Sequence, residues 1–555
     1  MPGPLISRGY FFMGPLLTLA SGSARALFGT HVGSIPSLKA GGYKSPNEKL
    51  NIAAVGIGGR GAQNLSGLRS ENIVALCDVD ARQGGPTFRR FDKAARYSDF
   101  RRMLDKEHQN IDAVVISTAD HMHATIALWC MERGKHVYVE KPLTRTPWEA
   151  RLLTEAALKY KVATQMGNQG YSHEGHKTAC EIIWSGEIGN VTEVHAVTSS
   201  PNWPQAIQSI PPEEPVPDGL DWDLWLGCAS MRPYTSGGWD KDHVPDGRTG
   251  PYNGSNYGFY VPHDWRGFYD FGTGSLGDAA IHALGPANQA LRLAAPIAVE
   301  CVRAEKRSSF SYPLYAVLRF DFPARGNMPP VSVYWYDTAR TGDPANYYHP
   351  KGLENEVLLP EENNLAARGR PDIGSSRAWS GKPQHVSGSG GETSRLGGAP
   401  PPGRKEGGPL PGVLMQDGAI FVGDKGYMAT VGRGEGVQLL PAARWADYTL
   451  PAPVLSRSPG HYRDWLRACK GGESACSNFS VAGPFAEWIT LGAIAYRYEG
   501  KLEYDANARR FTNNPGANQH LKPAFRKGWE LKLYSVPCAR VAMRCIDRMH
   551  KKVLG

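Results

Sequence analysis

Residues 50–80 constrain the fold of this chain more strongly than any other part of the sequence. They open with an apolar run, Ile52–Val55, which is typical of a strand buried on both faces of a parallel sheet. Three glycines follow with the spacing Gly56-x-Gly58-x-x-Gly61. This spacing lets the chain turn tightly, leave its backbone bare and pack the next helix closely. The stretch therefore predicts a βαβ unit of a parallel α/β sheet.

A second apolar run, Ile73–Cys77, ends in Asp78, about where an acid accepts hydrogen bonds from an adenosine ribose. The N–H groups of the intervening helix would face a pyrophosphate. A carboxylate at this position repels a ribose 2′-phosphate, and no arginine directly follows it. The order therefore predicts a Rossmann domain that binds NAD, with NADP less favoured; the alternative interpretation is an ordinary βαβ turn. The predicted cofactor contacts in this stretch are Gly56, Gly58, Gly59, Arg60, Gly61 and Asp78.

Length and charge limit the classes of protein to consider. A chain of 555 residues allows two or three domains and a large buried core. The formal net charge of +9 is modest for this length, and lysine and arginine are spread along the chain. Nucleic-acid binding therefore has little support.

Residues 1–48 resemble an export leader followed by a linker. The segment Ser7–Phe12 precedes an apolar stretch to Ala20 and then small residues, which is the layout of a secretory signal. It resembles a twin-arginine leader, although Gly9 stands where the second arginine belongs. The apolar part is too short and too broken to span a bilayer stably. We expect a periplasmic or otherwise exported protein, or a cytoplasmic one where the leader does not function.

The next predicted strand, residues 111–118, runs into a loop at residues 119–123. Ligands of open α/β sheets gather at the carboxyl ends of the strands. We therefore predict that Thr118, His121 and His123 belong to a cofactor loop; the alternative is that the histidines only shape this loop. No metal site is predicted, because no third ligand has a suitable spacing.

A further strand, residues 135–139, delivers Glu140, Lys141 and Pro142 to the same edge of the sheet. A lysine at that edge can lower its pKa through loss of solvent and can hydrogen-bond a substrate oxygen. The tripeptide thus predicts a functional lysine next to the cofactor turn.

The combination AVGIGGRG, ISTADHMH, GKHVYVEKPL and GSLGDAAIH resembles the glucose-fructose oxidoreductase, inositol dehydrogenase and MocA family. The resemblance extends from about residue 48 to residue 533 apart from one insertion. It implies an α/β Rossmann domain followed by an α+β domain with a large, open, mostly antiparallel sheet. It also implies NAD(P)-dependent oxidation or reduction of sugars, cyclitols and their derivatives.

The resemblance also implies roles for particular residues. Lys141, with Glu140 before it, matches the lysine that contacts the reacting hydroxyl and the nicotinamide, and its bond to proline is a candidate for the cis form. Asp278 and His282 match an acid and a histidine on one helix face, where the carboxylate orients an imidazole that acts as general base. Asn168 lies in the turn expected near the nicotinamide. The alternatives are a core histidine and a chance tripeptide.

Aromatic residues are frequent between residues 201 and 266 and stand next to Asp and Asn. Flat rings beside polar groups suit a pyranose, which packs its C–H groups on rings. We therefore predict substrate contacts from Trp203, Trp265, Arg266 and Tyr269, in addition to Lys141 and His282. The alternative is that the aromatic residues attach a long ordered loop to the sheet. The aromatic group comprises Trp203, Trp222, Trp225, Tyr234, Trp239, Tyr252, Tyr257 and Trp265.

The second domain is predicted to span residues 167–533, after a Rossmann domain at residues 49–166. Residues 338–411 are rich in Gly, Pro, Ser and Arg without a sustained period, so they predict an insertion that is at least partly disordered. A hairpin is expected over residues 419–427, and a C-terminal tail over residues 534–555.

These observations predict an NAD-dependent oxidoreductase that transfers hydride between nicotinamide and a secondary alcohol of a sugar, cyclitol or glycoside. A tightly held NAD suits an exported enzyme, and an open sheet favours a homodimer or homotetramer. One alternative is a glycosidase that oxidises its sugar transiently, eliminates the aglycone, adds water and reduces the sugar again. Another is a non-catalytic dinucleotide or sugar sensor.

Overall fold

The computed structural model describes residues 47–198, 203, 205–236, 259–338, 348, 350, 352–353, 356, 364–367 and 417–533. The predicted leader, almost all of its linker and the C-terminal tail lie outside these described residues. So do most of the predicted insertion and three of the aromatic residues, Trp239, Tyr252 and Tyr257.

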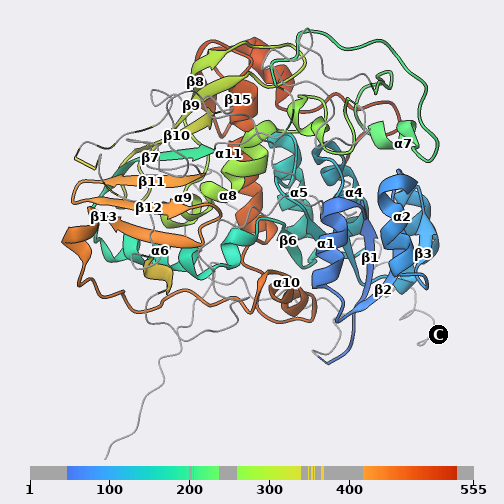
Figure 1. Cartoon of the computed structure of the whole chain (residues 1–555), viewed down its shortest axis with the longest axis horizontal. Coiled ribbons are helices and arrows are strands. Elements are labelled where there is room, and N and C mark those ends of the chain that lie inside the picture. Colours follow the sequence, from blue (N-terminus) through green and yellow to red (C-terminus); the bar gives the residue numbers. More distant parts are fainter. Residues whose placement is uncertain are drawn as a thin grey trace, which may run out of the picture. The chain divides into compact units, whose positions relative to one another are not determined.

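The first sheet has the strand order β3-β2-β1-β4-β5-β6, and every neighbouring pair is parallel. The order reverses between β1 and β4, where the ligand crevice of a doubly wound sheet lies. Its strands are β1 (Asn51–Val55), β2 (Asn72–Cys77), β3 (Ala95–Tyr97), β4 (Ala113–Ile116), β5 (His136–Val139) and β6 (Thr164–Met166). The helices between them are α1 (Gly59–Gly67), α2 (Ala81–Arg90), α3 (Phe100–Glu107), α4 (Asp120–Glu132) and α5 (Pro147–Tyr160). Figure 1 shows this Rossmann arrangement in blue and teal.

One boundary differs from the sequence prediction. The segment after β4 is not a loop over residues 119–123, because α4 already begins at Asp120. Ala119 has extended backbone angles, and an acidic residue in the first turn favours a helix N-terminus electrostatically. His121 and His123 therefore lie in the first turn of a helix.

Within the described residues, the second sheet has nine strands in the order β13-β12-β11-β7-β10-β9-β8-β14-β15. Only β7 and β10 pair in parallel, and the other neighbouring pairs are antiparallel. Its strands are β7 (Val191–Thr198), β8 (Ala298–Glu305), β9 (Tyr315–Phe322), β10 (Val331–Thr338), β11 (Asp417–Gly423), β12 (Tyr427–Val431), β13 (Gly436–Leu440), β14 (Gly500–Asp505) and β15 (Arg510–Phe511). The predicted fold class and the predicted hairpin at residues 419–427 are thereby confirmed.

Six further helices lie within the described residues: α6 (Glu174–Ser185), α7 (Trp222–Leu226), α8 (Ile281–Ala283), α9 (Gly285–Ala290), α10 (His461–Cys469) and α11 (Phe479–Ala495). Helix α11 packs on the sheet through Trp488, whose ring centre lies 5.1 Å from that of Phe320 and 5.3 Å from that of Phe322. Such edge-to-face contacts add to the free energy gained by burying the rings. Figure 1 shows α6, α9 and α11 close to the strands of this sheet.

Helices from the C-terminal part of the chain also complete the first domain. Trp465 and Cys469 of α10 join the apolar cluster that contains β1. Helix α11 packs on α5 so closely that a Cβ at Gly483 would lie 1.8 Å from Thr154 Oγ1. The sequence prediction ends the Rossmann domain at residue 166. The packed core of that domain nevertheless includes residues that lie far beyond residue 166 in the sequence.

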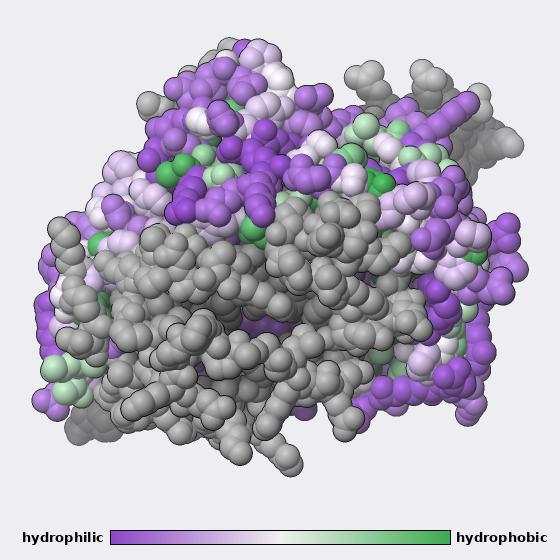
Figure 2. Space-filling view, turned by 45° about the horizontal axis from the view of Figure 1, so that its top comes forward, coloured by the Kyte–Doolittle hydropathy of each residue, from purple (hydrophilic) through white to green (hydrophobic). Residues whose placement is uncertain are grey.

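The surface of the described residues is mostly hydrophilic on the face that Figure 2 shows, wherever grey atoms do not cover it. Large apolar side chains that are exposed are scattered along the sequence: Leu158, Val216, Met231, Ile297, Val302 and Val454. Isolated apolar residues of this kind are normal on a protein surface. Among the described helices, we find none with the length and apolar character that a membrane crossing requires.

Candidate active site

The glycine-rich turn after β1 lies at the carboxyl edge of the sheet, and its glycines leave the backbone there without side chains. A Cβ on Gly56 would lie 2.7 Å from the carbonyl oxygen of Ser117, and Gly56 has a φ of +76°. A Cβ on Gly61 would lie 1.9 Å from the carbonyl oxygen of Gly56. Both contacts are too short for any side chain, so these glycines bring β1, β4 and α1 together as the spacing predicts.

Asp78 stands at the end of β2 and holds this turn. Its Oδ2 accepts hydrogen bonds from the backbone N–H of Ile57 at 2.9 Å and of Gly58 at 3.2 Å. Its Oδ1 accepts one from the N–H of Asp80 at 3.0 Å. Burial raises the pKa of Asp78 to about 6, although these hydrogen bonds oppose the shift. A carboxylate has lone pairs beyond these three bonds, so it can still accept from a ribose hydroxyl.

The first turn of α1 carries Arg60 and has no acidic residue. Arg60 Nε donates to Glu140 Oε1 at 3.1 Å, and Asn64 Nδ2 donates to the same oxygen at 3.0 Å. Burial raises the pKa of Glu140, but the charges of Arg60 and Lys141 outweigh it and hold that pKa below its usual value. Glu140 thus ties the end of β5 to α1, and its carboxylate contacts protein donors.

Lys141 meets Asp278 across 137 residues of sequence. Lys141 Nζ donates to the Asp278 carbonyl oxygen at 3.1 Å and forms an ion pair with Asp278 Oδ1. Arg266 Nε donates to the same Oδ1 at 3.0 Å. Gly277 permits this approach, since a Cβ there would lie 2.8 Å from Pro142 Cγ. The Lys141–Pro142 peptide bond is cis.

These contacts decide the charges of the pair. Burial lowers the pKa of Lys141, while the Asp278 carboxylate opposes that shift. Burial would raise the pKa of Asp278, but Lys141 and Arg266 hold it far below its usual value. Asp278 is therefore ionised at neutral pH, and it stabilises the ammonium that it contacts.

His282 follows on the same helical segment, one turn beyond Asp278. Asp278 lies in a π-helical turn, Leu276–Ala280, and His282 lies in α8 directly after it. Single π-turns of this kind are frequent at functional sites. The side chain of His282 is buried, and burial together with the charges of Arg433 and Lys141 lowers its pKa well below 6.5. Its imidazole is consequently neutral at pH 7.

The predicted hydrogen bond from Asp278 to His282 is not formed. Within the described part of the chain, Nδ1 of His282 has no hydrogen-bond partner. The Asp278 carboxylate instead contacts two cations, Lys141 and Arg266, and charge-assisted bonds of this type are stronger than a bond to a neutral imidazole. Asp278 therefore acts on the lysine and not on the histidine.

Asn168 provides a test of whether a nicotinamide fits here. Its side chain is completely buried, yet neither Nδ2 nor Oδ1 has a hydrogen-bond partner among the described residues. Leaving a buried polar group unpaired costs about 1–3 kcal/mol, so such an amide is a candidate for a group that a bound ligand satisfies. A donor and an acceptor side by side suit a carboxamide. Together with the glycine turn and Asp78, the residues present fit NAD.

The two histidines of α4 are less accessible than predicted. His121 is fully buried between Trp225 and Phe271, and its Nε2 donates to the Trp225 carbonyl oxygen at 3.0 Å. His123 is also fully buried, and its Nε2 donates to the Thr118 carbonyl oxygen at 3.0 Å. The structure therefore gives both histidines a packing role beneath the predicted loop. Thr118 itself is only partly buried at the end of β4.

The predicted aromatic sugar contacts are mostly core residues. Trp203, Trp265 and Tyr269 expose only 1%, 5% and 8% of their surface. Trp265 and Tyr234 belong to an apolar cluster that the loop builds within itself. In this structure these rings attach the loop to the domain, which is the alternative interpretation, and contact of Trp203, Trp265 and Tyr269 with a sugar stays a prediction. Arg266 differs, because it reaches Asp278 while its guanidinium carbon lies 4.2 Å from the Trp265 ring centre.

Arg433 is a residue of this site that the sequence analysis missed. It lies at the tip of the β12–β13 hairpin, and a Cβ on Gly170 would lie 2.1 Å from its carbonyl oxygen. Among the charges that lower the pKa of His282, that of Arg433 is the largest. The flanking glycines, Gly432 and Gly434, were the available signal of a tight turn. Nothing in the local sequence indicates that this turn packs against Gly170.

No group of three or more His, Cys, Asp or Glu side chains suitable for a metal ion occurs within the residues that the structure describes.

Residues 50–168 match the model of a family described as the oxidoreductase family with an NAD-binding Rossmann fold, Gfo/Idh/MocA. The NAD-binding domain at residues 50–168 belongs to the Gfo/Idh/MocA oxidoreductase family. The matched residues end at Asn168, so the family match covers the glycine turn, Asp78 and Lys141.

Curated relatives of this chain match a similarly short part of it, 26% and 29% of its length for the two described next. An inositol 2-dehydrogenase of Salmonella typhimurium is 29% identical over 152 residues, which is 26% of this chain and 45% of the relative. A glycosyl hydrolase family 109 protein of Solibacter usitatus is 29% identical over 177 residues, 29% of this chain and 39% of the relative. The chain thus covers less than half the length of these relatives.

Among solved structures, similarity extends over more of the chain at lower identity. An inositol dehydrogenase homologue of Azotobacter vinelandii, complexed with NADH and myo-inositol, has a TM-score of 0.44 and 14% identity. The alignment covers 82% of this chain and 98% of that structure.

Proposed function

We propose that this Gfo/Idh/MocA protein is an NAD-dependent dehydrogenase that oxidises a secondary alcohol of a sugar or cyclitol to a ketone, or catalyses the reverse reduction. The observation that carries the proposal is the convergence of Lys141, Asp278 and His282 at the carboxyl edge of a family NAD-binding domain. When bound, NAD supplies the hydride acceptor. The residues of the chain must then bind the alcohol, remove its proton and exclude water.

Lys141 is the residue that binds the substrate oxygen. Its ammonium donates one hydrogen bond to the Asp278 carbonyl oxygen and pairs with Oδ1, and an ammonium carries a third donor for a substrate hydroxyl. Burial lowers the pKa of Lys141, and the ion pair with Asp278 opposes that shift and so favours the ammonium form. A fixed positive charge stabilises the alkoxide character that develops as the hydroxyl proton leaves.

His282 is the general base in the oxidation direction. A base must be unprotonated before the reaction, and burial and neighbouring cations keep His282 neutral at pH 7. The hydroxyl proton passes to the imidazole while the carbon-bound hydrogen leaves as hydride, so the carbon becomes a carbonyl. In the reduction direction the protonated imidazole returns that proton. Asp278 acts as a positioning residue, because it contacts Lys141 and Arg266.

The cofactor preference follows from Asp78. This carboxylate lies beside the turn that would hold the pyrophosphate, where a ribose 2′-hydroxyl can donate to it and a 2′-phosphate would be repelled. We therefore propose NAD over NADP. The inositol 2-dehydrogenase relative supports a polyhydroxylated ring as the substrate class.

The test combines cofactor identification with a substrate screen. Mass spectrometry of the small molecules released from purified full-length protein should find NAD or NADH. NADH formation is then followed with cyclitols, aldoses and glycosides, each with NAD and with NADP. Wild-type protein should turn over a subset, and Lys141→Met, which retains the shape of the lysine stem, should not. A screen in which neither protein turns over any compound would leave the sensor hypothesis as the better account, and equal turnover by both would remove Lys141 from catalysis.

The glycosyl hydrolase family 109 relative supports a second candidate, a glycosidase that oxidises and re-reduces its sugar within one turnover. The same lysine and histidine would serve both oxidation steps. The two candidates differ in net redox change. Release of a phenol from an aryl glycoside without added NAD, and without accumulation of NADH or ketone, would establish the glycosidase and exclude the dehydrogenase.

We also propose that residues 1–48 direct export. A reporter that folds only outside the cytoplasm, fused after residue 48, should gain activity with the native leader. Replacing Arg8 by Ala should remove that gain where the leader is of the twin-arginine type.

A further inference from the structure

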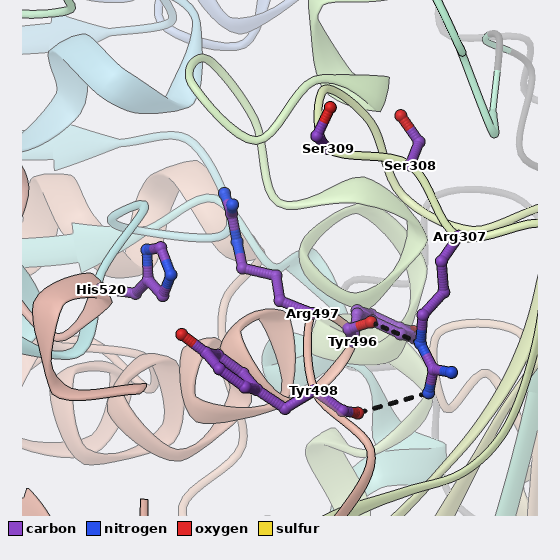
Figure 3. A pocket seen from close by; sticks show the side chains of 7 residues that line it. All are labelled: Arg307, Ser308, Ser309, Tyr496, Arg497, Tyr498 and His520. Atoms are coloured by element: carbon purple, nitrogen blue, oxygen red, sulfur yellow. Dashed lines mark hydrogen bonds between the residues drawn. The ribbon is translucent and has the colours of Figure 1, made fainter. Parts of the chain in front are cut away.

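A pocket outside the candidate active site lies where three segments far apart in sequence meet. The segments are the loop after β8, the end of α11, and a short 3-10 helix at Pro515–His520. The pocket has a volume of about 250 Å³. Its lining residues are Arg307, Ser308, Ser309, Tyr496, Arg497, Tyr498 and His520, and they are drawn in Figure 3. No carboxylate belongs to this lining among the residues that the structure describes.

Arg307 is a fixed cation on one side of the pocket. Its Nε donates to the Tyr496 carbonyl oxygen at 3.2 Å, and its Nη2 donates to the Tyr498 carbonyl oxygen at 3.3 Å, as the dashed lines in Figure 3 show. These carbonyls directly follow α11, where a positive charge is favourable. Its ion pair at 3.4 Å is with Glu499, a carboxylate that is 91% exposed, so water screens that attraction strongly.

Arg497 is the second cation, and it is held by an aromatic ring instead of an acid. Its guanidinium carbon lies 3.7 Å from the centre of the Tyr269 ring, which is a close cation–π contact. In the described part of the chain no ion pair joins Arg497 to a carboxylate. A stacked guanidinium keeps its N–H donors in the plane of the group, directed away from the ring and available for a planar acceptor. Tyr269, predicted as a sugar contact, thus supports an arginine.

The remaining polar groups add hydrogen-bonding capacity without negative charge. Ser309 is exposed at the edge of the pocket, and Figure 3 shows its hydroxyl on the side opposite Tyr498. The ring of His520 lies 6.0 Å from that of Tyr498. Burial and the charge of Arg497 lower the pKa of His520 to about 4, so its imidazole is neutral at pH 7 and serves as a hydrogen-bonding group.

We propose that this pocket binds a compact oxyanion, a phosphate or sulfate group, between the guanidinium groups of Arg307 and Arg497. Two guanidinium groups without a lining carboxylate present more charged donors than the protein itself satisfies, and tetrahedral oxyanions supply the acceptors that match them. The volume exceeds that of an inorganic ion, so an ester on a small sugar also fits. This site is independent of the proposed dehydrogenase activity, because none of its lining residues belongs to the candidate active site.

The experiment is isothermal titration calorimetry on the full-length protein with sodium phosphate and with sodium sulfate. NAD is kept in excess, so that the glycine turn is not offered to the anion, and sodium chloride holds the ionic strength constant. We expect saturable binding of both anions. Arg497→Gln should weaken it about tenfold or more, because it removes charged hydrogen bonds, and Arg497→Lys should restore only part of it.

Arg303→Gln is the matched control. Arg303 also stacks on a tyrosine, with its guanidinium carbon 4.9 Å from the Tyr315 ring centre, but it is paired with Glu305 and does not line the pocket. Its replacement should leave anion binding unchanged. Equal binding by wild type and Arg497→Gln, or loss of binding when chloride holds the ionic strength, would overturn the proposal.

Glucose 6-phosphate and glucose distinguish the source of the anion. Tighter binding of the ester than of phosphate, with no binding of glucose, would identify a sugar ester. Equal affinity of the ester and the ion would identify the free oxyanion. Both outcomes support the site, whereas binding of glucose alone would contradict it.

Discussion

The sequence predicts functional residues in two regions of this molecule, and the side chains of these two regions are arranged in opposite ways in the structure. At the end of β5 and in the π-helical turn, charged side chains contact one another and remain partly exposed. Lys141 and Arg266 both contact the same carboxylate oxygen of Asp278. In the loop around α7, aromatic side chains are buried against each other, with the rings of Trp222 and Trp225 4.7 Å apart. The first region can do chemistry, and the second is a core.

The difference follows from the physical basis of each prediction. Strand ends of a parallel sheet converge on one edge whatever the loops do, so charged residues placed there meet. Aromatic residues in a loop have no such constraint, and apolar burial favours their mutual packing over exposure to water. The position of residues relative to the sheet therefore indicated which side chains meet at the site better than the composition of a segment did.

The largest effect expected from this contrast is on Lys141. Lys141→Met removes the cation that we propose binds the substrate oxygen, and it leaves Asp278 paired with Arg266. We expect kcat to fall about a thousandfold, which is the order contributed by a proton-transfer or charge-stabilising group. Steady-state kinetics and NAD binding by fluorescence measure the two parts. A loss of NAD binding as large as the loss of kcat would show that the lysine is structural.

The opposite outcome is expected for Trp222, in the aromatic region. Its ring stacks on Trp225, and its Nε1 donates to the Arg232 carbonyl oxygen at 2.8 Å. Trp222→Ala should lower the free energy of unfolding by about 3–5 kcal/mol, while kcat of the folded protein changes little. Denaturant unfolding and kinetics at low temperature check both parts, with Trp222→Phe as the milder variant. A large rise in substrate KM in Trp222→Phe, at unchanged stability, would restore the sugar-surface interpretation.

Most of the fold was accessible from the sequence, because its signals are local. Apolar runs, the glycine spacing and the residues between them predicted most of the Rossmann strands. The start of α4 was predicted too late. The residue that precedes the helix is an alanine with extended backbone angles, and the acid and histidines that follow it are also common in loops. The partner of α10 was not predictable, since an amphipathic pattern shows that a helix face is buried but not against what.

The site was predictable only as far as motifs reach. Lys141, Asp278 and Asn168 were named from the family resemblance, and the structure brings the first two into contact. Their partners were not foreseen: Asp278 was assigned to His282, although two cations compete for it. Arg433 carried no motif at all, because its place depends on the register of the β12–β13 hairpin.

Acid pH should affect NAD binding by the cofactor turn and the activity of the catalytic cluster differently. The pKa of Asp78 is raised to about 6, so this carboxyl is protonated below pH 6 and loses an acceptor for ribose. The KM for NAD should then rise about tenfold one pH unit below that pKa. The folded state holds this proton more tightly than the unfolded state does, so the contribution of Asp78 to stability increases over the same acid range. Affinity and stability should therefore move in opposite directions.

Asp78→Asn is the control for that experiment. It should have a raised KM for NAD at neutral pH and lack the further rise near pH 6. Because the pKa of His282 is lowered well below 6.5, kcat should persist through this range. The same rise in the KM for NAD near pH 6 in Asp78→Asn would assign the titration to another group and would remove Asp78 from the ribose site.

The smallest expected effect tests whether the hairpin tip belongs to the charged region. The charge of Arg433 is the largest of those that lower the pKa of His282, so Arg433→Gln should raise that pKa toward its usual value. The acid limb of the kcat profile should then shift to higher pH, and Arg433→Lys should retain the wild-type limb. Arg444→Gln is the matched control, because Arg444 lies near the same strands with its guanidinium carbon 4.8 Å from the Trp445 ring centre. An acid limb that is identical in all four proteins would place Arg433 with the packing residues. A shift confined to Arg433→Gln would show that Arg433, which belongs to no sequence motif, adjusts the pKa of the proposed general base His282.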